Sequence, residues 1–258
     1  MIRRLHERWR AYTRRRRALL VGGLSLAAIV TVALVMVGLA RVPPAWWHPV
    51  DGASADVGAR AEKLENAMMG HVSLVRPRAS GPTRPGVSFQ SEDWRLSLRS
   101  EDANAWLAAR LGLWLEHRGA DRGVRTQFES VQVQFGEQRL RMGALLMKDG
   151  REQVVGVSAR PVVRSDGSLW FEEPIIEAGR LSVPASWAAG FLRARAERYL
   201  PAAMREQPAG RELLEIMAGE RPALREAVLR LEDGRRVRLL AITPREGRVE
   251  FLCRTEKR

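Results

Sequence analysis

The sequence predicts an α+β protein with one transmembrane helix near the N-terminus, followed by an antiparallel sheet packed on helices. Three observations lead to this prediction. Residues 18–40 form a run of 23 residues without a charged side chain. Later segments alternate apolar and polar residues and are joined by turn sequences such as Asp166-Gly167, a pattern typical of half-buried strands in hairpins. Strands and helices are grouped rather than strictly alternating, which favours α+β over α/β.

The apolar run is long enough to cross a bilayer. At 1.5 Å per residue, a helix over residues 18–40 spans about 35 Å, and a hydrocarbon core is about 30 Å thick. The run follows Arg14, Arg15, Arg16 and Arg17, whereas Arg41 alone flanks its other end. The positive-inside rule therefore places the N-terminus in the cytoplasm and the later residues outside it. We expect the two tryptophans at 46 and 47 to lie at the far membrane interface, where indole rings are enriched.

Two alternatives concern this N-terminal region. Residues 38–40 could be the cleavage site of a signal peptide, but the apolar part of such a peptide is about 7–15 residues long, which favours an uncleaved anchor. The basic tail, residues 1–17, could bind nucleic acid. Eight of its residues are arginine and one is acidic, so it carries +7 of the net charge of +13. Next to a membrane span, a topology signal that also attracts anionic lipid is the simpler interpretation, and we expect no nucleic-acid partner.

After the anchor, residues 41–86 are expected to form a juxtamembrane segment. An apolar stripe predicts a helix over residues 56–69, and five prolines and glycines within residues 76–86 predict a loop. The extracytoplasmic domain then spans residues 87–258. Its first elements are a strand over residues 94–98 and a helix that begins at Ser100, an N-cap residue followed by two acidic residues.

The rest of the domain is expected to be rich in strands. A meander of four antiparallel strands covers residues 131–135, 140–144, 154–163 and 169–176. A helix from 185 to 199 and a shorter one over 212–217 follow. Two hairpins end the chain, with strands at residues 228–231, 237–242 and 249–253. Asp-Gly pairs mark several of the turns.

No catalytic or metal-binding motif stands out. The four histidines do not form pairs at metal-ligand spacing, and Cys253 is the only cysteine. It lies in an apolar strand, so a buried, inert thiol is expected. Glu172 and Glu173 are adjacent in a strand, so we expect them to point to opposite faces. We therefore expect neither an enzyme nor a bound cofactor.

The pattern resembles a family. The opening of the second helix, residues 98–107, has an acidic residue followed by Asn104-x-x-Leu107, and residues 179–184 form a Gly-x-Leu-x-Val-Pro turn before a later helix. These stretches resemble YpmS-like membrane-anchored extracytoplasmic proteins and, more distantly, tubular lipid-binding (TULIP-like) domains. The resemblance covers about residues 87–200. It implies a long helix held in a strongly curved sheet, with an apolar groove that could take an acyl chain.

Two functions remain open on these grounds. The first is a membrane-tethered binding module for lipid or another apolar ligand. Its candidate groove residues are apolar and aromatic side chains of the domain: Leu181, Val183, Trp187, Phe191, Trp106 and Trp170. The second is a non-catalytic cell-envelope scaffold that acts through contacts with an envelope protein partner. Both place the chain in the cytoplasmic membrane as a single-pass protein, with the domain periplasmic or extracellular.

Overall fold

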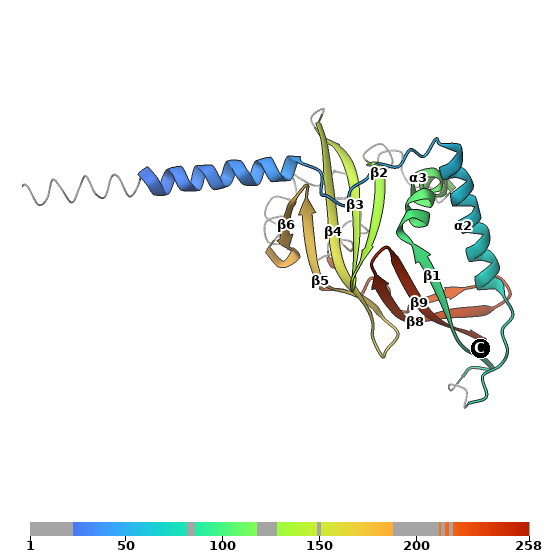
Figure 1. Ribbon diagram of the computed structural model, residues 1–258. Coiled ribbons are helices and arrows are strands. Elements are labelled where there is room, and N and C mark those ends of the chain that lie inside the picture. The colour runs from blue at the N-terminus through green and yellow to red at the C-terminus, as the bar shows by residue number, and fades with distance from the viewer. Residues whose placement is uncertain are drawn as a thin grey trace, which may run out of the picture.

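A computed structural model describes residues 23–81, 86–117, 128–148, 151–187, 212, 215–216 and 219–257. A long N-terminal helix projects from one end of a folded domain (Figure 1). Within the described residues, two antiparallel sheets, two long helices and a short helical segment at residues 185–187 form this domain. The α+β class predicted from the sequence is therefore confirmed.

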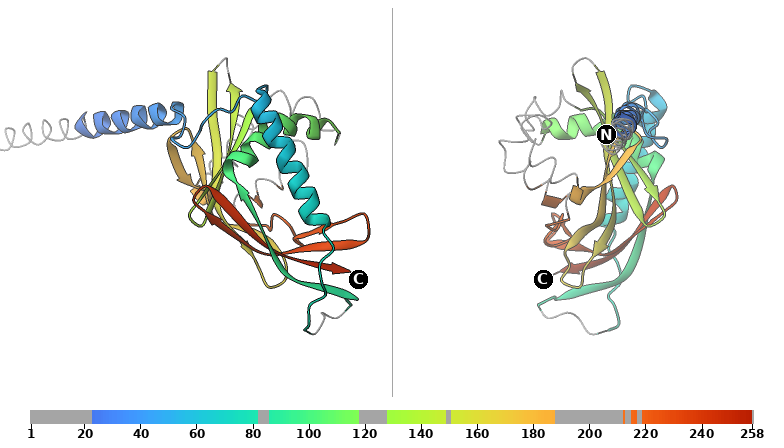
Figure 2. Two further views of the ribbon diagram at one scale, coloured as in Figure 1. Left: turned by 45° about the vertical axis from the view of Figure 1, so that its right-hand side comes forward. Right: turned by 90° about the vertical axis from the view of Figure 1, so that its left-hand side faces the viewer.

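Helix α1 (Gly23–Arg41) is apolar, has no buried residue and is long enough to cross a membrane. A membrane anchor and a signal sequence both fit this finding. Helix α2 (Ala55–Ser73) is longer than the predicted helix over residues 56–69, and α3 (Ser100–His117) begins at the predicted Ser100. These two helices pack against each other beside the sheets (Figure 2).

The predicted meander forms a five-stranded sheet in the order β2-β3-β4-β5-β6. Its strands are β2 (Phe128–Gly136), β3 (Arg139–Lys148), β4 (Arg151–Val163), β5 (Leu169–Ala178) and β6 (Leu181–Pro184). Consecutive strands pair in hairpins throughout, as the turn sequences predict. The short strand β6 adds one strand to the four that the sequence predicts.

The remaining strands form a separate sheet in the order β1-β9-β8-β7. They are β1 (Phe89–Arg99), β7 (Val228–Arg230), β8 (Arg235–Arg245) and β9 (Arg248–Lys257). The expectation of one strongly curved sheet is therefore wrong, because the C-terminal hairpin pairs with β1 and not with the meander. Two open sheets result, and neither curls around a long helix.

Polar side chains of α3 cover the edge strand of the five-stranded sheet. The Asn104 amide donates to the Val133 carbonyl over 2.9 Å, and Asn104 Oδ1 accepts the Val133 N–H at 2.7 Å. The Ser100 hydroxyl accepts the Phe135 N–H at 3.0 Å. These two side chains take the place of a neighbouring strand and leave less of the β2 edge open for pairing with another chain.

Small apolar clusters join the elements. Ala103 of α3, Phe135 of β2 and Val249 of β9 pack together and connect both sheets to the helix. A second cluster, Trp94 and Cys253 with Val237, lies within the four-stranded sheet. Cys253 is free and buried, as expected. Burial raises the pKa of its thiol to about 11.

The predicted helix over residues 185–199 is described only at its start, where residues 185–187 are helical. The rest of that helix lies outside the described residues, as do residues 213, 214 and 217 of the helix predicted over residues 212–217 and all of the basic tail with Arg14–Arg17.

Candidate functional site

The most extensive site in the described part of the chain is a contact between the end of α1 and the five-stranded sheet. We call residues 39–48 the juxtamembrane clasp. The Arg180 backbone N–H, in the turn between β5 and β6, donates to the Leu39 carbonyl over 2.8 Å. Arg180 Nε donates to the Pro43 carbonyl over 3.3 Å. The clasp therefore begins with bonds between the last turn of α1 and this hairpin.

One cross-strand row of the sheet receives the clasp. In the register of the sheet, Gln132 lies opposite Gly143, Gly143 opposite Gly156, and Gly156 opposite Glu177. We call these four residues the docking row. Residues directly opposite one another in adjacent strands project from the same face, so the row presents two polar ends with two glycines between them.

The two glycines make room for tryptophan. A Cβ atom at Gly143 would lie 2.7 Å from Trp46 Cη2 and 3.3 Å from Trp47 Cζ3. A Cβ atom at Gly156 would lie 3.5 Å from Trp46 Cζ2. Since carbon atoms pack at about 3.5–4.0 Å, Gly143 allows a ring approach that any larger residue would obstruct. The rings of Trp46 and Trp47 meet edge to face, with centroids 5.8 Å apart.

The polar ends of the docking row bind the clasp directly. Trp46 Nε1 donates to Glu177 Oε2 over 2.8 Å, and the His48 backbone N–H donates to Gln132 Oε1 over 3.1 Å. Glu177 and Gln132 are both buried. Arg141 Nε lies 3.9 Å from the other Glu177 oxygen, so the buried carboxylate faces both a hydrogen-bond donor and a positive charge.

The sequence predicts a membrane-interface position for the two tryptophans but does not predict that they pack on the sheet. Trp47 is buried and Trp46 is half-buried against the sheet. The reason is the slot over Gly143 and Gly156, which offers the rings a packed surface and a hydrogen-bond acceptor. The sequence does not predict any member of the docking row as a site residue. The sequence does contain a pattern that could have identified the glycine pair, because pairing residues outward from the predicted turn at 149–150 places Gly143 opposite Gly156.

The candidate groove residues lie in several places. Trp170 pairs with Val162 near the start of β5, whereas Leu181 pairs with Ala178 at the opposite end of that strand. Trp106 is a half-buried residue of α3.

The other members of the candidate groove are near β6 or beyond the described residues. Leu181 and Val183 are half-buried on β6, and Trp187 is 76% exposed. Phe191 lies outside the described residues.

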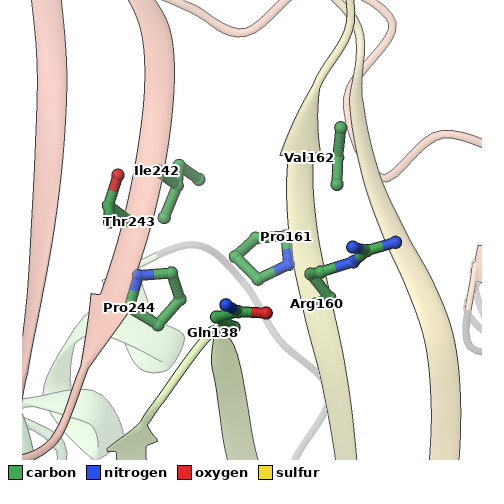
Figure 3. Close-up of a pocket in the computed structure, with 7 residues that line it drawn as sticks. All are labelled: Gln138, Arg160, Pro161, Val162, Ile242, Thr243 and Pro244. Atoms are coloured by element: carbon green, nitrogen blue, oxygen red, sulfur yellow. The ribbon is translucent and has the colours of Figure 1, made fainter.

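Neither of two depressions on the described surface is lined by a candidate groove residue. The first has a volume of about 230 Å³ and lies between β4 and β8, beside the β2–β3 turn (Figure 3). Its lining consists of Gln138, Arg160, Pro161, Val162, Ile242, Thr243 and Pro244. The second, of about 150 Å³, lies over β8 and β9. Ligand pockets typically hold at least about 300 Å³, so both are small for an acyl chain.

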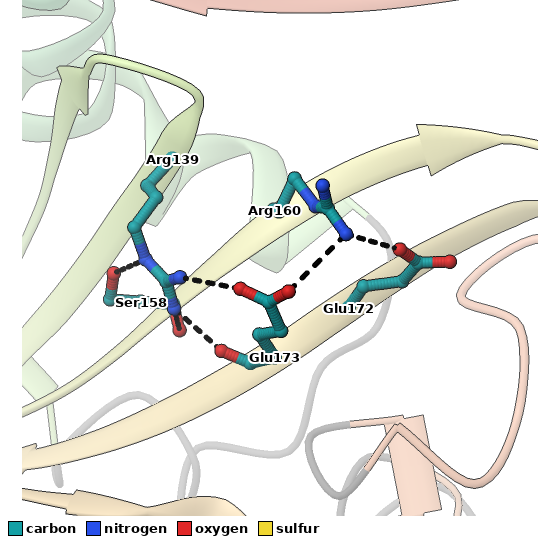
Figure 4. A network of polar contacts seen from close by, with 5 residues as sticks. All are labelled: Arg139, Ser158, Arg160, Glu172 and Glu173. Carbon is teal, nitrogen blue, oxygen red and sulfur yellow. Dashed lines mark hydrogen bonds and ion pairs between the residues drawn. The ribbon is translucent and has the colours of Figure 1, made fainter.

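An ion-pair network borders the first depression. Arg160 Nη2 lies 2.9 Å from Glu172 Oε2 and 3.3 Å from Glu173 Oε1 (Figure 4). The expectation that these two carboxylates point to opposite faces is therefore wrong. A bulge in β5, where Glu173 and Pro174 lie opposite the single residue Ala159 of β4, breaks the alternation of β5, and Glu173 has a positive φ of 49°.

The network leaves its charges paired. Arg139 donates to the Ser158 hydroxyl and to the Glu173 carbonyl, over 3.1 and 2.5 Å. Arg164 Nη2 lies 3.6 Å from Glu172, and its guanidinium stacks 3.9 Å from the centre of the Trp170 ring. Within the described residues, no group of three or more His, Cys, Asp or Glu side chains could hold a metal ion. These contacts indicate a structural role for the network.

Comparison with known proteins adds no relative, since no protein-family model, curated protein or solved structure matches this chain. The resemblance to YpmS-like proteins stays a prediction. Its Asn104 has a clear structural role in this fold, because it seals the β2 edge.

Proposed function

We propose that this protein is a single-pass scaffold of the cell envelope whose extracytoplasmic domain is held in one pose at the membrane surface and acts through contacts with a protein partner. In this proposal α1 is an uncleaved anchor, the N-terminus is cytoplasmic and the domain has no enzymatic activity. The juxtamembrane clasp is the observation that carries the proposal, because it binds the anchor to the sheet through backbone, indole and amide hydrogen bonds.

A fixed pose suits a scaffold better than a lipid carrier. A carrier needs an open apolar cavity, whereas here the chain's own tryptophans fill the slot over Gly143 and Gly156. A scaffold needs its binding surface at a defined height and orientation. Since Arg41 ends α1 and the clasp begins at residue 39, no flexible linker separates the anchor from the sheet.

The pose can be measured on the full-length protein in lipid nanodiscs. Spin labels at Val30→Cys and Met142→Cys report the position of the sheet relative to the anchor. Met142 is exposed, and its neighbour Gly143 faces the clasp, so the label projects away from the contact. We expect one narrow distance distribution by double electron–electron resonance. A broad distribution would mean that the domain moves freely on its tether and would refute the fixed pose.

The scaffold function needs a second test in cells. Photo-crosslinking residues at Val75 and Leu229, two exposed apolar positions remote from the clasp, should give a discrete protein adduct. Its yield should fall in a Gly143→Ala variant, which disturbs the clasp, and persist in the control Gly136→Ala. Acyl lipid recovered from the domain at one molecule per chain, with no protein adduct, would favour the lipid-binding module instead. A reporter after Arg258 that is active only outside the cytoplasm tests the topology.

A further inference from the structure

The clasp determines which part of the domain lies at the bilayer surface. The turn between β5 and β6 contacts the end of the anchor directly, since a Cβ atom at Gly179 would lie only 2.5 Å from the carbonyl oxygens of Ala40 and Val42. With the bond from Arg180 to Leu39, this contact places the β5–β6 turn where the chain leaves the membrane.

Strand β6 and the short helical segment after it share that level. In two views they lie beside the C-terminal end of α1 along the helix axis, while the four-stranded sheet lies farther along the axis (Figures 1 and 2). The segment at residues 185–187 is fixed to the domain, because Ala185 is buried. Trp187 therefore projects from an ordered part of the fold.

The exposed side chains here have the chemistry of a headgroup contact. Trp187 has the most exposed indole among the described tryptophans, and indole rings are enriched at headgroup level. Arg41 and Arg180 are exposed, and neither forms an ion pair with a carboxylate of the described residues. Guanidinium groups bind phosphate through several N–H donors.

We propose that the membrane-proximal patch, formed by Arg41, Arg180 and Trp187, binds the phosphate headgroups of the leaflet that faces the domain. The indole of Trp187 lies in the headgroup layer, and the two guanidinium groups bind lipid phosphates. In this proposal Trp187 is the indole at headgroup level, a position that the sequence predicts for Trp46 and Trp47. Those two side chains pack on the sheet instead. The proposal rests on the proposed function, since it requires α1 to span the membrane and the clasp to hold the domain.

The test uses the full-length protein in phosphatidylcholine nanodiscs, with and without phosphatidylglycerol. A spin label at Trp187→Cys should collide rarely with an aqueous nickel complex and often with dissolved oxygen. A label at Leu229→Cys is the matched control, because Leu229 is also an exposed apolar residue but belongs to the distal sheet. We expect the Leu229 label to collide often with the nickel complex and less often with oxygen, as a label in water does. Equal nickel accessibility at the two positions would overturn the proposal.

A second measurement keeps the native indole. Lipids with a headgroup quencher should quench part of the tryptophan fluorescence, and Trp187→Phe should remove that part. An unchanged quenched fraction in this variant would also overturn the proposal. The Val30–Met142 distance is recorded on separately labelled protein in the same nanodiscs. If it stays narrow while Trp187 behaves as an aqueous residue, only the headgroup contact fails. If the distance is broad, the fixed pose has failed as well.

Discussion

Replacing Gly143 by alanine should release the juxtamembrane clasp. The added Cβ would lie 2.7 Å from Trp46 Cη2 and 3.3 Å from both Trp46 Cζ2 and Trp47 Cζ3. Contacts this short lie inside the packing distance of about 3.5–4.0 Å, so the Trp46 ring must move by roughly 1 Å or leave the slot. A ring that leaves loses its hydrogen bond to Glu177.

The cost can be estimated from the contacts that are lost. A hydrogen bond to a charged acceptor contributes about 1.5–3 kcal/mol, and an aromatic pair contributes about 0.5–1.5 kcal/mol beyond its buried area. Gly143→Ala should therefore destabilise the protein by about 2–4 kcal/mol, which lowers Tm by about 4–16 °C for a chain of this size.

Gly136 provides the matched control. It is a strand glycine of the same sheet, and a Cβ there would meet its nearest neighbours at 3.8 and 4.0 Å, which is ordinary contact. Because glycine weakens a strand by about 0.5–1 kcal/mol relative to alanine, Gly136→Ala should leave Tm unchanged or raise it slightly. Thermal unfolding by circular dichroism and the Val30–Met142 distance together give the result. If both variants keep the parent Tm and the narrow distance, the slot does not hold the clasp.

Three further outcomes follow from the structure. Gly179→Ala should broaden the distribution of the Val30–Met142 distance. The control is Gly247→Ala, because Gly247 also has positive φ but has open space around it, and this variant should keep the distribution narrow. Equal broadening in both variants would mean that backbone strain, and not the contact with α1, causes the broadening. Arg238→Met leaves the 3%-exposed Glu256 without its 3.1 Å partner and should cost about 3–5 kcal/mol in chemical denaturation, so a loss below about 1 kcal/mol would contradict the pairing. Cys253, with its pKa raised to about 11 by burial, should have roughly one thiolate in a thousand at pH 8 and resist iodoacetamide until the protein unfolds; rapid labelling of the native protein would contradict its burial.

Local patterns in the sequence predict much of this fold. The apolar run gives α1, and the Asp-Gly turns give the hairpins of the meander, because turn geometry and alternation act over a few residues. The partition into two sheets is not local. It depends on the pairing of β1 with β9, strands separated by most of the domain. A propensity pattern contains no information on which distant strands pair.

The departure at Glu172 and Glu173 has a local cause. Alternation along β5 predicts opposite faces, but β5 itself is bulged, since Glu173 and Pro174 lie opposite the single residue Ala159 of β4, and Glu173 takes positive φ. Both carboxylates then reach Arg160. The alternation pattern assumes a regular strand, and the extra residue in β5 breaks that assumption at the two carboxylates.

The packing of Trp46 and Trp47 on the sheet is a contact that the sequence does not predict, and it changes the function proposed for the protein. At the headgroup level of a membrane, the N–H of an indole can form a hydrogen bond with water while its ring contacts apolar groups. The docking row offers the same two kinds of contact, since Glu177 accepts a hydrogen bond from the Trp46 N–H and the glycine pair leaves a flat surface for the ring. The tryptophans thus connect the segment after α1 to the sheet. If α1 spans a bilayer as proposed, its tilt must also tilt the five-stranded sheet, so the proposed headgroup contact at Trp187 and Arg180 and the tilt of α1 constrain each other.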